Sequence, residues 1–147
     1  MTFDPNDKQG RHGLDRLERA TAAWLTTVTA EGQPQTMPVW FTWDAAANDG
    51  TGEILVYGDH RAKRNRNLEA NPRVALLLAD ADEGNDFVTI EGTARFDPDY
   101  PPVGENDRYM AKYGQTIERY YGGPATFGQT YSMPIRITLT RGRAIGA

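Results

Sequence analysis

Cysteine is absent from this chain of 147 residues. Its absence excludes disulfide bonds, thiolate catalysis and cysteine metal sites together, and it favours a cytoplasmic location. Histidine is scarce as well, and the two histidines, His12 and His60, do not have the spacing of metal ligands. We therefore expect a protein without a metal site.

Long apolar runs and an excess of positive charge are also missing. No stretch reaches the 18 or more apolar residues of a membrane span, and no apolar N-terminal run indicates a signal peptide, so we expect no membrane association. Lys and Arg total 16 against 20 Asp and Glu, which gives a net charge of -4. An acidic chain is a poor candidate for nucleic-acid binding.

Several motifs with known chemistry do not occur. The sequence has no P-loop, no Rossmann fingerprint and no Gly-x-Ser-x-Gly. The acidic stretch that contains Asp80, Asp82, Glu83 and Asp86 does not follow the EF-hand pattern, so we interpret it as a solvated turn.

The residues that are present suffice for one folded domain. Hydrophobic residues make up 39% of the chain and aromatic residues 10%, and 147 residues can bury a sizeable core. We expect a single domain over residues 1–147, in which the polar residues 1–11 are flexible.

Apolar periodicity predicts a mainly β protein with peripheral helices. Short hairpins dominate and no βαβ alternation occurs, which favours a small antiparallel barrel. Gly92 predicts a bulge or a close backbone approach within its strand, and residues 122–132 are expected to be irregular. Helices are predicted over residues 12–21 and 105–121, and strands over residues 24–29, 35–43, 53–57, 73–79 and 87–96 and around residues 135–139.

The strand predicted over residues 35–43 has two different faces. Met37, Val39, Phe41 and Trp43 alternate onto one face, which we interpret as core. The other face carries Thr36, Pro38 and Trp40 and is the better candidate for the wall of a bound ring system. Because proline cannot donate to a ladder, Pro38 indicates an edge strand or a bulge.

A basic segment lies between two apolar runs, from Tyr57 to Val74. The Asn71-Pro72 pair ends any helix there, which leaves a helix of about three turns. Its first half is crowded with cations and is a candidate phosphate site, although a solvated surface helix is the alternative. Tyr57 and His60, at the start of the segment, are further candidate cofactor contacts. The cations are Arg61, Lys63, Arg64 and Arg66.

Several of these features occur together in a known family. They are the hairpin sequence from Gly32 to Phe41, the strand from Ile54 to Tyr57, the Asn-Leu-x-x-Asn-Pro pattern from Asn67 to Val74, and Glu91 to Ala94. Over residues 12–142 the chain resembles the pyridoxamine-phosphate-oxidase-like split β-barrel proteins. More narrowly, it resembles the flavin/deazaflavin oxidoreductases of group B, which depend on coenzyme F420.

The resemblance implies a split antiparallel β-barrel of the FMN-binding type, assembled as a homodimer with the cofactor in a groove at the subunit interface. It implies that the basic segment holds the cofactor phosphate and that the edge strand runs along the ring system. The phosphate contacts are Arg61, Lys63, Arg64 and Asn67; the ring contacts are Thr36, Met37, Pro38 and Val39; Asn85 and Tyr131 approach from the second subunit.

The function implied by the resemblance is hydride transfer from reduced coenzyme F420 to a small organic acceptor, such as an activated double bond or a quinone. An FMN-dependent oxidoreductase and a non-catalytic flavin-binding protein of the same fold are the alternatives. The chain lacks a C-terminal substrate segment and a late histidine, which disfavours vitamin B6 and haem as substrates. No catalytic residue is predicted beyond Tyr57 and Tyr131 as candidate proton donors, and the main phosphate ligand stays open between Lys63 and Arg64.

Overall fold

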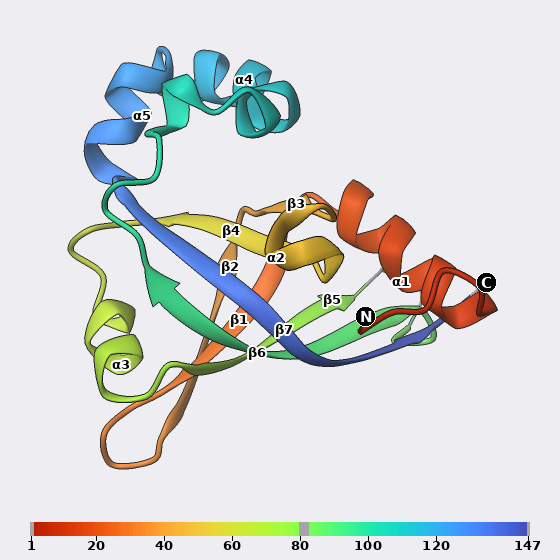
Figure 1. The fold of residues 1–147 in the computed structure, drawn as a ribbon. Helices are drawn as coiled ribbons and strands as arrows, with labels where there is room; N and C mark the ends of the chain where they lie inside the picture. The colour runs from red at the N-terminus through yellow and green to blue at the C-terminus, as the bar shows by residue number, and fades with distance from the viewer. Residues whose placement is uncertain (1, 80–82, 147) are drawn as a thin grey trace.

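The computed structural model describes residues 2–79 and 83–146, in which seven antiparallel strands form one curled sheet. The strand order is β2-β1-β5-β6-β7-β4-β3, and the curl gives the sheet the shape of a half-barrel (Figure 1). The strands are β1 (Ala23–Val28), β2 (Pro34–Val39), β3 (Thr42–Asp44), β4 (Glu53–Gly58), β5 (Arg73–Ala79), β6 (Phe87–Phe96) and β7 (Met133–Ile145).

The helices lie around the sheet, as the sequence predicts. In Figure 1, α4 and α5 form a layer over β4, α3 lies at the other side of the sheet beside the β1–β2 hairpin, and α1 lies near both chain ends. Within the described ranges, no helix has the length and apolar character needed to cross a membrane. The bounds are α1 (Lys8–Arg19), α2 (Ala47–Gly50), α3 (Arg64–Ala70), a 3-10 turn (Val103–Glu105), α4 (Asp107–Tyr121) and α5 (Pro124–Thr130).

Strand β4 separates two cores. All six of its residues are buried, because alternate side chains point to opposite faces and both faces are covered. Ile54 and Val56 face the interior of the half-barrel. Leu55 and Tyr57 face the layer of α4 and α5 and pack there with aromatic side chains. Most of the hydrophobic driving force is thus shared between the half-barrel interior and the helical layer.

The strand predicted over residues 35–43 is broken into β2 and β3. At the break, side chains of α4 take the place of a neighbouring strand: the Phe41 amide donates to the Tyr113 hydroxyl (2.9 Å), and the Phe41 carbonyl accepts from Lys112 Nζ (2.7 Å). Phe41 and Trp43 are buried as predicted, but Met37 is 58% exposed, so its assignment to the core is wrong. Pro38 does lie on an edge strand.

The N-terminal segment is packed against the fold, in contrast to the flexibility expected from its composition. Phe3 is buried in the main core, and α1 begins at Lys8, four residues before the predicted start. Asp86 accepts from His12 Nε2 (2.8 Å) and from Arg16, and these partners hold the pKa of Asp86 below its usual range. Asp86 therefore binds α1 through His12 and Arg16. Asp80 and Asp82 of the acidic stretch lie outside the described residues.

Two further sequence predictions meet different outcomes. The register between β6 and β7 shifts at Gly92, where a Cβ would lie 2.7 Å from the Thr138 carbonyl oxygen, so the predicted bulge is confirmed. Residues 122–132 are not irregular, because they contain α5.

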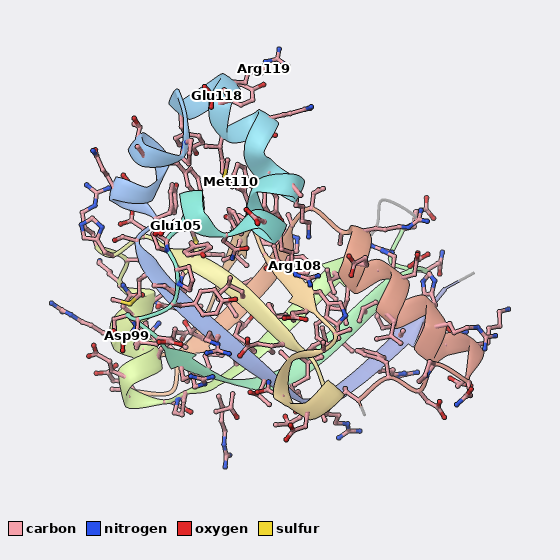
Figure 2. The ribbon with its side chains drawn as sticks, turned by 45° about the horizontal axis from the view of Figure 1, so that its top comes forward. Asp99, Glu105, Arg108, Met110, Glu118 and Arg119 are labelled. Atoms are coloured by element: carbon pink, nitrogen blue, oxygen red, sulfur yellow. The ribbon has the colours of Figure 1, made fainter. Side chains whose placement is uncertain are left out.

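Helix α4 ends above the sheet: Glu118 and Arg119 point away from it, whereas Arg108 donates to the Trp43 carbonyl at 3.1 Å (Figure 2).

Candidate functional site

An open groove of about 700 Å³ lies between the β1–β2 hairpin and the segment that leads into α3. Its apolar part comes from the inner face of the hairpin, where Met37 is paired with Leu25. Its polar part comes from residues 59–64. The groove is lined by Leu25, Thr27, Gln35, Thr36, Met37, Pro38, Asp59, Ala62, Lys63, Arg64 and Tyr131.

The basic segment differs from its predicted form. Helix α3 starts at Arg64 and has seven residues, so a helix of three turns that includes Arg61 and Lys63 is wrong. Arg61 instead folds back on Asp59 (Nε–Oδ1 3.3 Å), and this hydrogen bond lowers the pKa of the Asp59 carboxyl. His60 is exposed, and its Nδ1 lies 3.0 Å from the Thr130 carbonyl oxygen. Arg61 and His60 are thus outside the groove lining.

Arg64 is a partly buried cation that is influenced by the charge of Asp59 but makes no ion pair in the part of the chain that the structure describes. Its Nε is buried and has no hydrogen-bond partner, and no carboxylate pairs with it within residues 2–79 and 83–146. Its Nη2 lies 3.3 Å from the position that a Cβ on residue 58 would take, so Gly58 leaves room for the guanidinium. Burial lowers the pKa of Arg64. Such a group is costly unless an anion satisfies it.

Lys63 supplies a second positive charge to the groove. It is exposed and lines the groove beside Arg64. The two side chains together offer several N–H donors to an anionic group, which is the arrangement that phosphate and carboxylate ligands require.

Asn67 connects α3 to the hairpin. Its amide nitrogen donates to Thr27 Oγ1 (3.0 Å) and to Gln35 Oε1 (2.9 Å), and the side chain is buried. The donors of Asn67 are therefore already engaged inside the protein.

A second cavity, of about 190 Å³, adjoins the groove beneath α4 and α5. Pro38, Arg64 and Tyr131 line both spaces and form the boundary between them. We call this second space the aromatic cavity. Its lining is Pro38, Val39, Trp40, Val56, Tyr57, Arg64, Tyr109, Tyr121, Phe127 and Tyr131.

Four of the surrounding rings form a nearly parallel stack. Trp40 stacks on Tyr113 with centroids 4.7 Å apart and on Phe127 at 5.7 Å. Phe127 stacks in turn on Tyr131 at 4.5 Å. The stack therefore runs from the interior of the helical layer to the boundary with the groove.

The tyrosines at the cavity differ in their hydrogen bonds. The Tyr57 hydroxyl donates to the Pro101 carbonyl (2.6 Å) and accepts from Asn106 Nδ2 (3.0 Å), so it is engaged on both sides. Tyr109 is only 1% exposed, and its ring packs edge-on against that of Tyr57, with centroids 4.8 Å apart. Burial raises the pKa of Tyr57, of Tyr109 and of Tyr131, so all three are protonated near neutral pH.

The structure brings together eight of the twelve cofactor contacts predicted from the sequence. These line the groove or the aromatic cavity: Thr36, Met37, Pro38, Val39, Tyr57, Lys63, Arg64 and Tyr131. Asn85 does not join them within one chain, since it precedes Asp86, which binds α1 at the other end of the sheet from α3 (Figure 1).

Sequence reasoning did not identify Gln35 and Asp59 of the groove, or Tyr109, Tyr121 and Phe127 of the cavity. Tyr109 and Tyr121 lie at helical spacing within the helix predicted over residues 105–121, a signal for burial that does not indicate a cavity. In the described residues, no group of three or more His, Cys, Asp or Glu side chains could hold a metal ion.

A protein family described as pyridoxamine 5'-phosphate oxidase matches residues 13–143. The chain belongs to this family. Its seven-stranded half-barrel is the split β-barrel of the pyridoxamine 5'-phosphate oxidase family, so the predicted fold is confirmed. A search of curated proteins finds no match.

Solved structures agree on the split barrel. An F420 reductase is 27% identical, with 87% of this chain and 93% of that chain covered and a TM-score of 0.61. An FAD-binding protein from Mesorhizobium loti is 18% identical (92% and 94% covered, TM-score 0.63), and the heme storage protein HutZ from Vibrio cholerae is 22% identical (99% and 96%, TM-score 0.55). The last two likenesses concern the fold alone.

Proposed function

We propose that this protein is an oxidoreductase that binds the deazaflavin coenzyme F420 in the groove. The observation that carries the proposal is Arg64, a partly buried guanidinium whose Nε has no hydrogen-bond partner, beside Lys63 at the polar end of a groove of about 700 Å³. A volume of this size is typical of cofactor sites. An anionic cofactor group would satisfy Arg64 through charge-assisted hydrogen bonds.

The other wall of the groove suits a flat ring system. Met37, which is 58% exposed, presents apolar surface, and the exposed edge of β2 at Thr36 and Pro38 offers backbone groups. When bound, the reduced cofactor supplies a hydride to an acceptor. The chain's own contribution is to hold the anionic group at Lys63 and Arg64, to align the ring along β2, and to exclude water at the boundary formed by Tyr131.

Coenzyme F420 is favoured over FMN by the similar F420 reductase, which is 27% identical over 87% of this chain. FMN is the alternative, since Arg64 alone could satisfy one phosphate and the same fold occurs in an FAD-binding protein.

A fluorescence titration of the purified protein with F420 and with FMN, at the same salt concentration, tests the choice of cofactor. We expect F420 to bind more tightly. Equal or tighter binding of FMN would favour the alternative, and binding of neither would contradict the proposed function. Reduction of a model acceptor under steady-state conditions then separates an enzyme from a flavin carrier.

We also propose that the protein is a symmetric homodimer. Trp24 is paired with Pro38 on one side and Leu77 on the other, so these side chains share the outer face of the sheet. Trp24 is 49% exposed and Leu77 40%. This apolar row adjoins the groove at Pro38, so a second copy that covers it would also border the cofactor site.

A further inference from the structure

We propose that Lys112 is an acylation site, at which a small acyl phosphate transfers its acyl group to the lysine amine. The site is a pocket of about 260 Å³ between α1, β3 and α4. It shares no lining residue with the groove or the aromatic cavity, so the proposal does not depend on the proposed function. The pocket is lined by Glu18, Thr42, Trp43, Arg108, Ala111 and Lys112.

Two cations of α4 border the pocket. Arg108 and Lys112 are four residues apart in the helix, so their side chains leave the same face. Lys112 Nζ donates to the Phe41 carbonyl (2.7 Å), and Arg108 Nη1 donates to the Trp43 carbonyl (3.1 Å). Four helical residues and two extended residues both span about 6 to 7 Å, so the two contacts match in spacing. The amine and the guanidinium are thus held side by side.

The Lys112 nitrogen keeps a lone pair for reaction when it is neutral. An ammonium has three N–H donors, so a neutral amine has two donors and one lone pair. The Phe41 carbonyl accepts one of these donors and leaves the lone pair unused. The Phe41 ring, whose centroid lies 4.0 Å from Nζ, shields the amine from water.

The surroundings of Lys112 favour the neutral amine. Burial lowers its pKa to about 8, whereas the negative charge of Glu18, an exposed residue of α1, raises it less. Arg108 is a like charge, and Tyr113, whose ring centroid lies 5.3 Å from Nζ, is kept protonated by burial. At pH 7 roughly one Lys112 amine in ten is then neutral, against about one in three thousand for an ordinary lysine. Desolvation of this kind activates lysine nucleophiles.

Arg108 determines the leaving group. Its guanidinium has five N–H donors, and the Trp43 carbonyl accepts from Nη1. Its Nη2 lies 3.7 Å from Asp44 Oδ1, but both side chains are exposed, so this ion pair is weak. The guanidinium can therefore bind a phosphate group at the pocket. This arrangement favours an acyl phosphate over an uncharged acyl donor.

The transfer step balances without a further reactant. The neutral Lys112 amine attacks the carbonyl carbon of the acyl phosphate, a C–N bond forms, and the C–O bond to the phosphate breaks. The nitrogen releases one proton, which the leaving phosphate takes up. The product is an uncharged amide that keeps one N–H for the Phe41 carbonyl, so acylation removes the positive charge and can retain the hydrogen bond.

The chain has three lysines, so the exposed Lys8 and Lys63 serve as internal controls. The full chain is incubated with acetyl phosphate near neutral pH, and peptide mass spectrometry follows acetylation at each lysine. We expect Lys112 to react at least about five-fold faster than Lys8, a smaller gain than the fraction of neutral amine suggests, because nucleophilicity falls with pKa, as it does for thiolates. In guanidinium chloride the difference should disappear. A Lys112 that reacts no faster than Lys8 in the folded chain overturns the inference.

The pH profile gives a second readout on the natural chain. The acetylation rate of Lys112 should level off between about pH 8 and 9, where its amine has lost the proton. The rate of Lys8 should continue to rise toward the pKa of an ordinary lysine. Coinciding profiles would mean that the pocket does not activate Lys112, and the inference would fail.

Arg108→Gln tests the class of acyl donor. With acetyl phosphate, acetylation of Lys112 should slow about three- to ten-fold, since a charge-assisted contact at an exposed position is lost. With 4-nitrophenyl acetate, an uncharged donor of the same acyl group, the rate should stay within about two-fold. Arg119→Gln, at an exposed position of the same helix, should change neither rate. Equal slowing with both donors overturns the acyl phosphate as substrate, and the pH profile of the natural chain still decides if Arg108→Gln does not fold.

Discussion

Lys63 and Arg64 are adjacent in the sequence but have different surroundings. Lys63 is exposed in the groove, whereas Arg64 is partly buried over Gly58 and lines both the groove and the aromatic cavity. The two cations should therefore contribute differently to the binding of an anion. The partly buried guanidinium is less screened by water and should contribute more per hydrogen bond.

Asn67 is predicted to contact the cofactor phosphate, but its side chain donates to Thr27 and Gln35 within the protein. Replacing Asn67 by Ala leaves the Thr27 hydroxyl and the Gln35 amide oxygen without their donor. We expect Asn67→Ala to lose about 1–3 kcal/mol of stability and to change the cofactor Kd by less than about three-fold. Denaturant unfolding and cofactor titration measure the two effects. A large loss of affinity without loss of stability would instead support direct contact with the cofactor.

Lys112 gives a pH-dependent prediction. Burial lowers the pKa of Lys112 to about 8, against 10.5 for an ordinary lysine, while Glu18 opposes the shift. Between these two values the unfolded chain binds the proton that the folded chain has released, so stability rises with pH across this window. Below pH 8 both states are protonated and the pH dependence ends.

The comparison is with Lys112→Met, which has no such proton. From pH 8 to 10.5 the natural chain should gain about 1 kcal/mol relative to the variant, after allowance for the partial exposure of the ammonium. Tyrosine titration affects both chains and largely cancels in the difference. Chemical denaturation at several pH values measures it, and parallel stability curves would show that Lys112 titrates normally.

At the residue scale, the sequence predicts charged contacts better than packing contacts. Lys63 and Arg64 are visible as a cluster of cations between two strands, and Pro38 as a break in a ladder. Asp59 and Gln35 carry no such pattern, because their places in the groove depend on how the hairpin approaches α3. The position of Tyr109 in the lining of the aromatic cavity likewise depends on rings that are distant in the sequence.

At the scale of elements, hairpin patterns locate the strands well because alternation survives wherever one face is buried. The predicted continuous strand over residues 35–43 fails at Phe41, whose backbone groups bind Tyr113 and Lys112 of α4. The sequence does not predict helix α5, because Gly122 and Gly123 before it and Gly128 within it indicate a loop. Pro124 at its first turn is a start signal that could have identified it.

The N-terminal segment provides a test at this scale. Phe3 is buried beside Gly13 and Gly142, where a Cβ on either glycine would collide with its ring. We expect Phe3→Ala to lower stability by about 3–5 kcal/mol, whereas Lys8→Ala, at an exposed position, should change it by less than about 0.5 kcal/mol. Thermal unfolding measures both. Equal melting temperatures for the two variants would mean that the segment is mobile, as its composition suggests.

At the scale of the whole molecule, the exposed row of Trp24 and Leu77 is the feature that the isolated chain leaves unexplained. The homodimer predicts a particle of twice the 16.4 kDa chain mass at micromolar concentration. Trp24→Glu should shift the protein to monomer, because a charge at the centre of an apolar interface is left unpaired. Light scattering measures the mass.

Tyr120→Glu is the matched control, since Tyr120 is also an exposed aromatic but lies on α4, away from the proposed interface. It should remain a dimer. A monomer of the natural chain, or a dimer that persists in Trp24→Glu, would contradict the proposed interface.

In the proposed complex, Lys63 and Arg64 hold the anionic part of a flavin-type cofactor. The most direct measurement is the F420 affinity of the double variant Lys63→Ala, Arg64→Ala, with melting temperature recorded on the same sample. The control double variant, Arg66→Ala with Arg119→Ala, removes the same charge from two exposed positions outside the groove.

Each charge-assisted hydrogen bond is worth about 1.5–3 kcal/mol, so the site variant should bind F420 at least about ten-fold more weakly than the natural chain, with less dependence on salt. The control should bind within about two-fold of the natural chain, and both variants should stay folded. An unchanged affinity in a folded Lys63→Ala, Arg64→Ala protein would contradict the proposed cofactor site, because neither cation would then bind the anionic group.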